Sequence, residues 1–149
     1  MTGPDMRGPR VDDPVATRDE WLSRLDQLLT RVKGWAESAG WSTRVIEKSM
    51  RDSVLSPYKA PAMLMQRETV KVILDPVGRF APGTEGVVDL YLLPAYDDIA
   101  SLYFVDGHWK LHYAFRATPM VAGIRQAESI ALDEVSLNRV LDEIAAHAA

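Results

Sequence analysis

The longest amphipathic pattern in the chain is helical. Between residues 17 and 39, apolar side chains recur every three or four positions, which places them along one stripe of a helix. Thr17 and Glu20 match a capping box at its start, and Gly40 is suited to its left-handed end. The pattern predicts a helix packed on a sheet. Because Trp21 and Trp35 share the stripe, a dimerisation helix is the alternative.

Most of the remaining chain shows short apolar runs or alternation, which predicts strands. Strands are expected at 41–50, 62–67, 69–75, 87–93, 99–105 and 108–115, with loops at 51–61 and 76–86. A further short strand at 128–132 and a helix from about residue 133 or 136 to 148 complete the chain. We therefore expect an α+β two-layer sandwich, with an N-terminal and a C-terminal helix on a mostly antiparallel sheet of about five to six strands. Residues 1–16, rich in proline and glycine, are predicted to be a disordered tail before a single domain at 17–149.

Two turns between residues 87 and 115 predict the strand register. Asp106 and Gly107 fit a two-residue hairpin turn, which places Leu102 opposite Leu111. If 94–98 is a simple five-residue loop, Leu90 lies opposite Leu102. Both turns then agree on one apolar face, expected to meet the helices: Val88, Leu90, Leu92, Ala100, Leu102, Phe104, Trp109, Leu111 and Tyr113.

The opposite face of the same three strands holds the best cluster of chemically capable groups in the chain. The predicted register gives two cross-strand rows, Asp89–Tyr103–Lys110 and Tyr91–Ser101–His112. With His108, these residues form the candidate binding face: Asp89, Tyr91, Ser101, Tyr103, His108, Lys110 and His112.

Several chemistries fit this face poorly. His108 and His112 would lie roughly 13 Å apart on a strand, too far to share one metal ion. Ser101 beside His112 lacks the strand-to-helix elbow that presents a nucleophilic serine. Tyr91 and Tyr103 could stack nucleobases, but they neighbour Asp89 in an acidic protein. We expect no catalytic residues, no metal site and no cofactor.

Three other motifs point to chemistry only weakly. The loop at 76–86 is glycine-rich, but a strand follows where a phosphate cradle needs a helix. Asp97 and Asp98 resemble a cation site, although turn aspartates commonly accept backbone amides instead. A restriction-nuclease-like site would need an acid on one strand and an acid-x-lysine on the next. Asp75 and Asp89 fit, but Tyr91 stands where lysine is required.

Composition narrows the function classes further. The chain has 149 residues, no cysteine and a net charge of −4, so cysteine-bound metals and thiol catalysis are excluded. The acidic balance disfavours generic binding to nucleic acid or anionic membranes. The N-terminal residues lack the apolar core of a signal peptide, which predicts a cytoplasmic protein.

These observations favour a non-catalytic interaction module, such as a subunit, an adaptor, or a chaperone-like or immunity-like protein. It would bind a protein partner or a second copy of itself through the sheet face. The first alternative is a small-molecule-binding or hydrolytic domain using Asp89, Lys110 and His112. The second is a restriction-nuclease-like domain with an incomplete active site.

Overall fold

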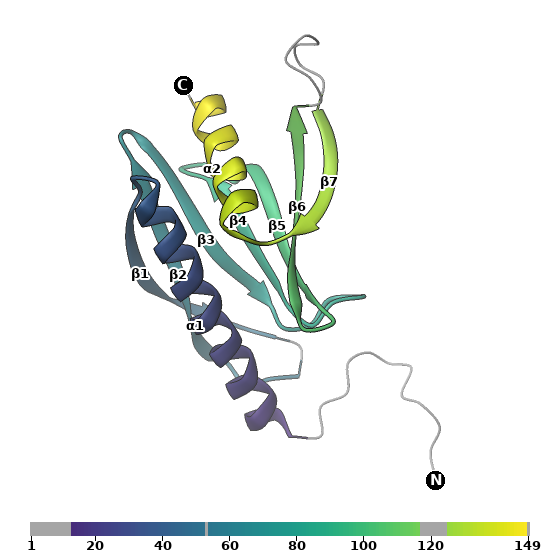
Figure 1. Cartoon of the computed structure of the whole chain (residues 1–149). Coiled ribbons are helices and arrows are strands. Elements are labelled where there is room, and N and C mark those ends of the chain that lie inside the picture. Colours follow the sequence, from purple (N-terminus) through teal and green to yellow (C-terminus); the bar gives the residue numbers. More distant parts are fainter. Residues whose placement is uncertain (1–12, 53, 117–124, 149) are drawn as a thin grey trace.

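A computed structural model describes residues 13–52, 54–116 and 125–148 as two helices and seven strands (Figure 1). In chain order the elements are α1 (Pro14–Ser38), β1 (Ser42–Met50), β2 (Tyr58–Arg67), β3 (Val70–Gly78), β4 (Val87–Leu92), β5 (Asp97–Val105), β6 (His108–Arg116), β7 (Arg125–Ala131) and α2 (Glu134–Ala148). The strands form one antiparallel sheet in which each strand pairs with its neighbours in sequence. The predicted α+β arrangement is confirmed, with slightly more strands than expected.

Helix α1 begins about one turn before its predicted start. Asp13 is the N-cap, and its carboxylate accepts a hydrogen bond of 3.0 Å from the amide of Ala16. The predicted capping box at Thr17 is wrong, because the amide of Thr17 already bonds to the Asp13 carbonyl. An N-cap aspartate followed by proline is a favoured helix start, since Pro14 lacks the amide hydrogen that would be unpaired there. Residues 14–16 of the predicted tail thus form the first turn, and 1–12 lie outside the described residues.

Two predicted loops are shorter than expected because the adjoining strands are longer. Strand β2 begins at Tyr58 and pairs with β1 from there, although 51–61 was expected to be a loop. Strand β3 continues through Pro76 to Gly78, where an irregularity shifts its pairing with β4. Proline at such an irregularity is tolerated, because one ladder hydrogen bond is already missing.

The register of the central strands is partly as predicted. The β5–β6 hairpin is confirmed, with Leu102 opposite Leu111. Between β4 and β5 the predicted register is wrong by two residues, because Leu90 lies opposite Ala100. A bulge after Leu90 and a β5 strand that begins at Asp97 replace the simple loop. Since side chains alternate with a period of two, this shift changes the cross-strand partners but keeps the residues of β4 and β5 on their predicted faces.

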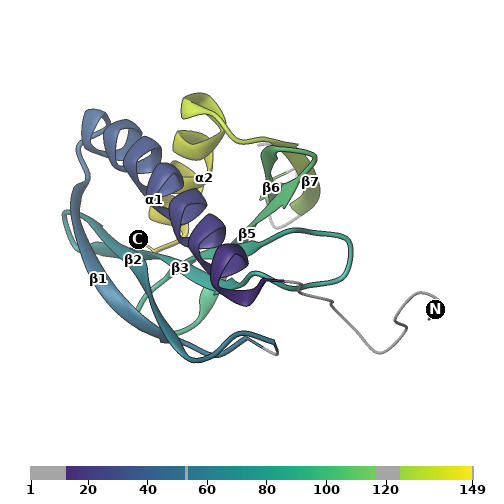
Figure 2. The same cartoon turned by 90° about the horizontal axis from the view of Figure 1, so that it is seen from below.

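Both helices cover the same face of the sheet, which curves around them (Figure 2). Trp21, fully buried, donates from its indole nitrogen to the hydroxyl of Tyr58 at 2.9 Å. Of the predicted apolar face, Leu92 and Phe104 are partly buried and the other seven residues are at most 6% exposed. Because Trp21 lies in this core, it is not available to a dimerisation helix. Neither described helix has the length and apolar character needed to cross a membrane.

Candidate functional site

The seven predicted site residues all lie on β4, β5 and β6, but their exposure differs. His108, Lys110 and His112 are exposed, whereas Tyr91, Ser101 and Tyr103 are half-buried. Asp89 is buried at 8% exposure.

The observed register places these residues in different rows from those predicted. Asp89 lies opposite Ser101, which lies opposite His112. Tyr103 lies between Val87 and Lys110. In both predicted rows the pairing between β5 and β6 is confirmed, with Tyr103 opposite Lys110 and Ser101 opposite His112. The pairing of Asp89 with Tyr103 and of Tyr91 with Ser101 is wrong, because the bulge in β4 shifts β5 by two residues.

The Asp89 carboxylate is held by two hydroxyl groups. The Ser101 hydroxyl donates to it at 3.0 Å. The hydroxyl of Tyr96, in the turn between β4 and β5, donates to its other oxygen. Because both oxygens accept a hydrogen bond, the carboxylate is compensated for its removal from water.

A second carboxylate lies directly across the ladder. Asp75 on β3 pairs with Asp89 in register, and it accepts hydrogen bonds from Lys48 Nζ at 2.7 Å and from the Tyr91 hydroxyl at 2.8 Å. The same ammonium donates to the carbonyl of Pro76 at 2.7 Å. One lysine thus offsets the repulsion between two facing acids. We call Asp75, Asp89 and their side-chain donors Lys48, Tyr91, Tyr96 and Ser101 the aspartate pair.

The tyrosines of the aspartate pair are stable donors at neutral pH. Burial, and then the hydrogen bond to Asp75, raise the pKa of Tyr91 to about 12. The hydrogen bond to Asp89, followed by burial, raises the pKa of Tyr96 to about 12. Their rings meet edge to face with centroids 4.5 Å apart, and Tyr96 is 60% exposed.

The arrangement does not assemble a serine nucleophile with a histidine base. Ser101 donates to Asp89, so its proton points to a carboxylate rather than to the neighbouring His112. A nucleophilic triad needs the serine bonded to the histidine and the histidine bonded to the acid. Within the described residues, no three histidine, aspartate or glutamate side chains converge as ligands for one metal ion.

Of the two aspartates in the Asp97–Asp98 turn, only Asp97 accepts a backbone amide as expected. Asp97 accepts the backbone amide of Asp98 at 2.9 Å. Asp98 instead accepts from the Tyr113 hydroxyl at 2.6 Å, and one of its oxygens lies 2.7 Å from Nδ1 of His147. The other ring nitrogen of His147 lies 3.4 Å from Glu143. This cluster joins the end of α2 to the start of β5, a role that sequence reasoning missed.

Lys48 and Tyr96 are the other residues that sequence reasoning missed. Lys48 is distant from both acids in the sequence, and the restriction-nuclease pattern requires its lysine two residues after Asp89. A lysine side chain is long enough to reach two strands away, and in the structure it does. Tyr96 lies in the predicted loop at 94–98. Its position before two aspartates gave no signal that it bonds to Asp89.

The chain was compared with family models, curated proteins and solved structures, and none of them matches it.

Proposed function

We propose that the protein is a non-catalytic interaction module that binds a protein partner through the sheet face opposite the helices. One observation carries the proposal. Both helices pack on one face, so in the described part of the chain no element covers the other face (Figure 2). Tyr103, Lys110 and His112 lie next to one another there on β5 and β6, and we call these three the open patch.

The open patch combines one residue type that is enriched at interfaces with two exposed hydrogen-bond donors. A half-buried tyrosine offers a rigid apolar ring and a hydroxyl, the combination enriched at interface cores. Lys110 and His112 are exposed, and neither side chain forms a hydrogen bond or ion pair within the described residues. Their donors are therefore available to acceptors on a partner.

The aspartate pair supports binding over catalysis. A general base must accept a proton from its substrate, so its carboxylate must be accessible. Asp89 is buried, and both it and Asp75 already accept two hydrogen bonds. Beside the open patch on the same face, the pair would then hold β3, β4 and the β4–β5 turn in a fixed shape.

Photo-crosslinking from the sheet tests the proposal. A benzoylphenylalanine in place of Tyr103 should form a covalent adduct of defined mass, with a partner or a second copy, in the source cell. The matched control carries the same group in place of Lys33, which is exposed on α1 on the other side of the molecule. Equal adducts from both positions, or none from Tyr103, would contradict the proposal.

A second candidate function has one observation in its favour. Lys48, on β1, bonds to Asp75, which faces Asp89 across the ladder, whereas the sequence pattern required a lysine at the position of Tyr91. Two acids and a lysine are the groups that position a metal-bound water in metal-dependent nucleases. This candidate predicts that Mn²⁺ raises the melting temperature and that Asp75→Asn abolishes the rise. No shift with Mn²⁺ in the unmodified protein would exclude it.

The hydrolytic alternative using Asp89, Lys110 and His112 gains no such support. Lys110 belongs to the row of Tyr103, while Asp89 and His112 flank Ser101. Asp89 is also the most buried of the seven predicted residues.

A further inference from the structure

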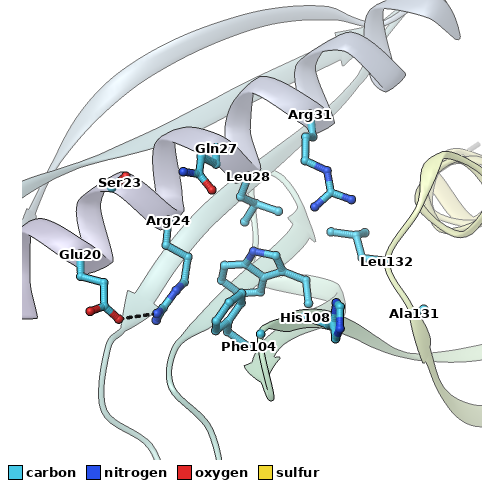
Figure 3. A pocket seen from close by; sticks show the side chains of 12 residues that line it. Glu20, Ser23, Arg24, Gln27, Leu28, Arg31, Phe104, His108, Ala131 and Leu132 are labelled. Atoms are coloured by element: carbon cyan, nitrogen blue, oxygen red, sulfur yellow. Dashed lines mark hydrogen bonds and ion pairs between the residues drawn. The ribbon is translucent and has the colours of Figure 1, made fainter.

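A cavity of about 450 Å³ lies on the helix side of the molecule, between α1 and the β5–β6 hairpin (Figure 3). Leu28, Trp109 and Leu132 contribute apolar surface to its lining. Its volume falls within the range of about 300–1,000 Å³ that is typical of small-ligand sites. His108 lines this cavity as well. Its predicted place on the sheet face opposite the helices is therefore wrong, and it is not part of the open patch.

One arginine of the cavity is fixed in place. Arg24 pairs with Glu20 at 2.7 Å, donates to the carbonyl of Glu85 at 2.9 Å and lies 4.0 Å from the centre of the Phe104 ring. Its side chain is only 12% exposed. Glu20 is the one carboxylate among the described lining residues, and Arg24 neutralises it.

The second arginine has no acidic partner. Arg31 lies two turns further along α1, and Figure 3 shows its guanidinium reaching toward the region of His108 and Leu132. Its contact within the described residues is with the ring of Trp35, at 5.0 Å. Gln27, one turn before Arg31, and His108 form no side-chain hydrogen bond there either. In a chain of net charge −4, this cavity therefore carries an uncompensated positive charge beside unused donors.

We propose that the cavity binds a small organic anion: a carboxylate or a phosphate monoester attached to an aromatic or aliphatic body. The guanidinium of Arg31 would pair with the anionic group, since its planar donors match carboxylate and phosphate oxygens. Gln27 and His108 are placed to donate further hydrogen bonds. The apolar body would pack on Trp109, Leu28 and Leu132. This site is separate from the open patch and stands whether or not the open patch binds a protein.

Three probes that share one ring test the ligand class: benzoate, phenyl phosphate and the neutral benzamide. Binding is followed by NMR at the indole signal of Trp109, which Trp109→Phe assigns. We expect the two anions, at about 10 mM, to shift this signal and benzamide to leave it unchanged. The tighter of the two anions identifies the carboxylate or the phosphate as the preferred group. No shift with either anion, or an equal shift with benzamide, would overturn the proposal.

Matched variants locate the charge. Arg31→Gln should weaken binding of the preferred anion about tenfold, as expected for losing one charge-assisted pair. Arg18→Gln removes the same charge from the same helix outside the cavity, and it should bind like the unmodified protein. His108→Gln alters a second exposed residue of the cavity, and we expect it to weaken binding of the preferred anion less than Arg31→Gln does. Equal losses in the Arg18 and Arg31 variants, or inorganic phosphate binding as tightly as phenyl phosphate, would contradict the assignment.

Discussion

The aspartate pair and the cavity beneath α1 are both polar, but they use their polar groups in opposite ways. In the aspartate pair, Asp75 and Asp89 each accept two hydrogen bonds from within the chain. In the cavity, Arg31 has no acidic partner among the described residues. Polar groups that are paired internally hold the fold in shape, whereas unpaired groups at a surface are available to a ligand. The comparison therefore separates a structural cluster from a proposed binding site.

The largest effect is expected at Asp89. Asp89→Ala removes the acceptor of two hydroxyl groups, and hydrogen bonds to a charged group contribute about 1.5–3 kcal/mol each. Relief of repulsion with Asp75 offsets part of the loss, so the free energy of unfolding should fall by about 2 kcal/mol. Urea denaturation measures this. A change below about 0.5 kcal/mol would place Asp89 outside the structural cluster.

A smaller loss is expected at Lys48. Lys48→Met keeps the length of the side chain but leaves Asp75, 16% exposed, with Tyr91 as its remaining donor. Because the Lys48 side chain is 37% exposed, solvent screens the pair, and we expect a loss of about 1 kcal/mol. A double-mutant cycle with Asp75→Asn should show coupling between the two positions. Simple additivity would contradict a direct interaction.

Alkaline pH should weaken the aspartate pair through Tyr91. Its pKa is raised from 10.0 to about 12 in the folded protein, so the protonated hydroxyl stabilises the fold fully below pH 10. That contribution is lost as the pH rises through about 12. Tyr91→Phe should therefore show a shallower fall in stability over this range. Tyr103→Phe is the control, since the Tyr103 hydroxyl forms no hydrogen bond within the described residues. If stability falls equally steeply with pH in both variants, Tyr91 does not cause the alkaline loss of stability.

The cavity should show the smallest effect on stability. Arg31→Gln and His108→Gln are expected to change the free energy of unfolding by less than about 0.5 kcal/mol, because both side chains are exposed and neither is paired with an acid. Thermal and urea denaturation check this. A loss above 1 kcal/mol in either variant would show that the cavity residues are structural after all.

The faces of the sheet could be predicted from the sequence, but the contacts across it could not. Asp106 and Gly107 fixed one hairpin, and the period of two kept Leu90 on the core side even though the neighbouring register was wrong. The bulge that places Asp89 opposite Ser101 could not be predicted, because no residue type around Leu90 indicates a bulge. The contacts of Lys48 with Asp75, and of His147 with Asp98, join positions 27 and 49 residues apart. Such contacts depend on sheet curvature and helix placement, which local patterns do not encode.

Recovery of native complexes tests the central claim, that the protein acts by binding a partner through the open patch. Three tagged forms are compared by native mass spectrometry: the unmodified protein, Tyr103→Ala with His112→Ala, and the control Lys33→Ala on α1. The account predicts one complex of fixed mass for the unmodified protein and the control, and at least about a tenfold loss for the double variant at unchanged stability. Equal recovery of that complex from all three forms would contradict it.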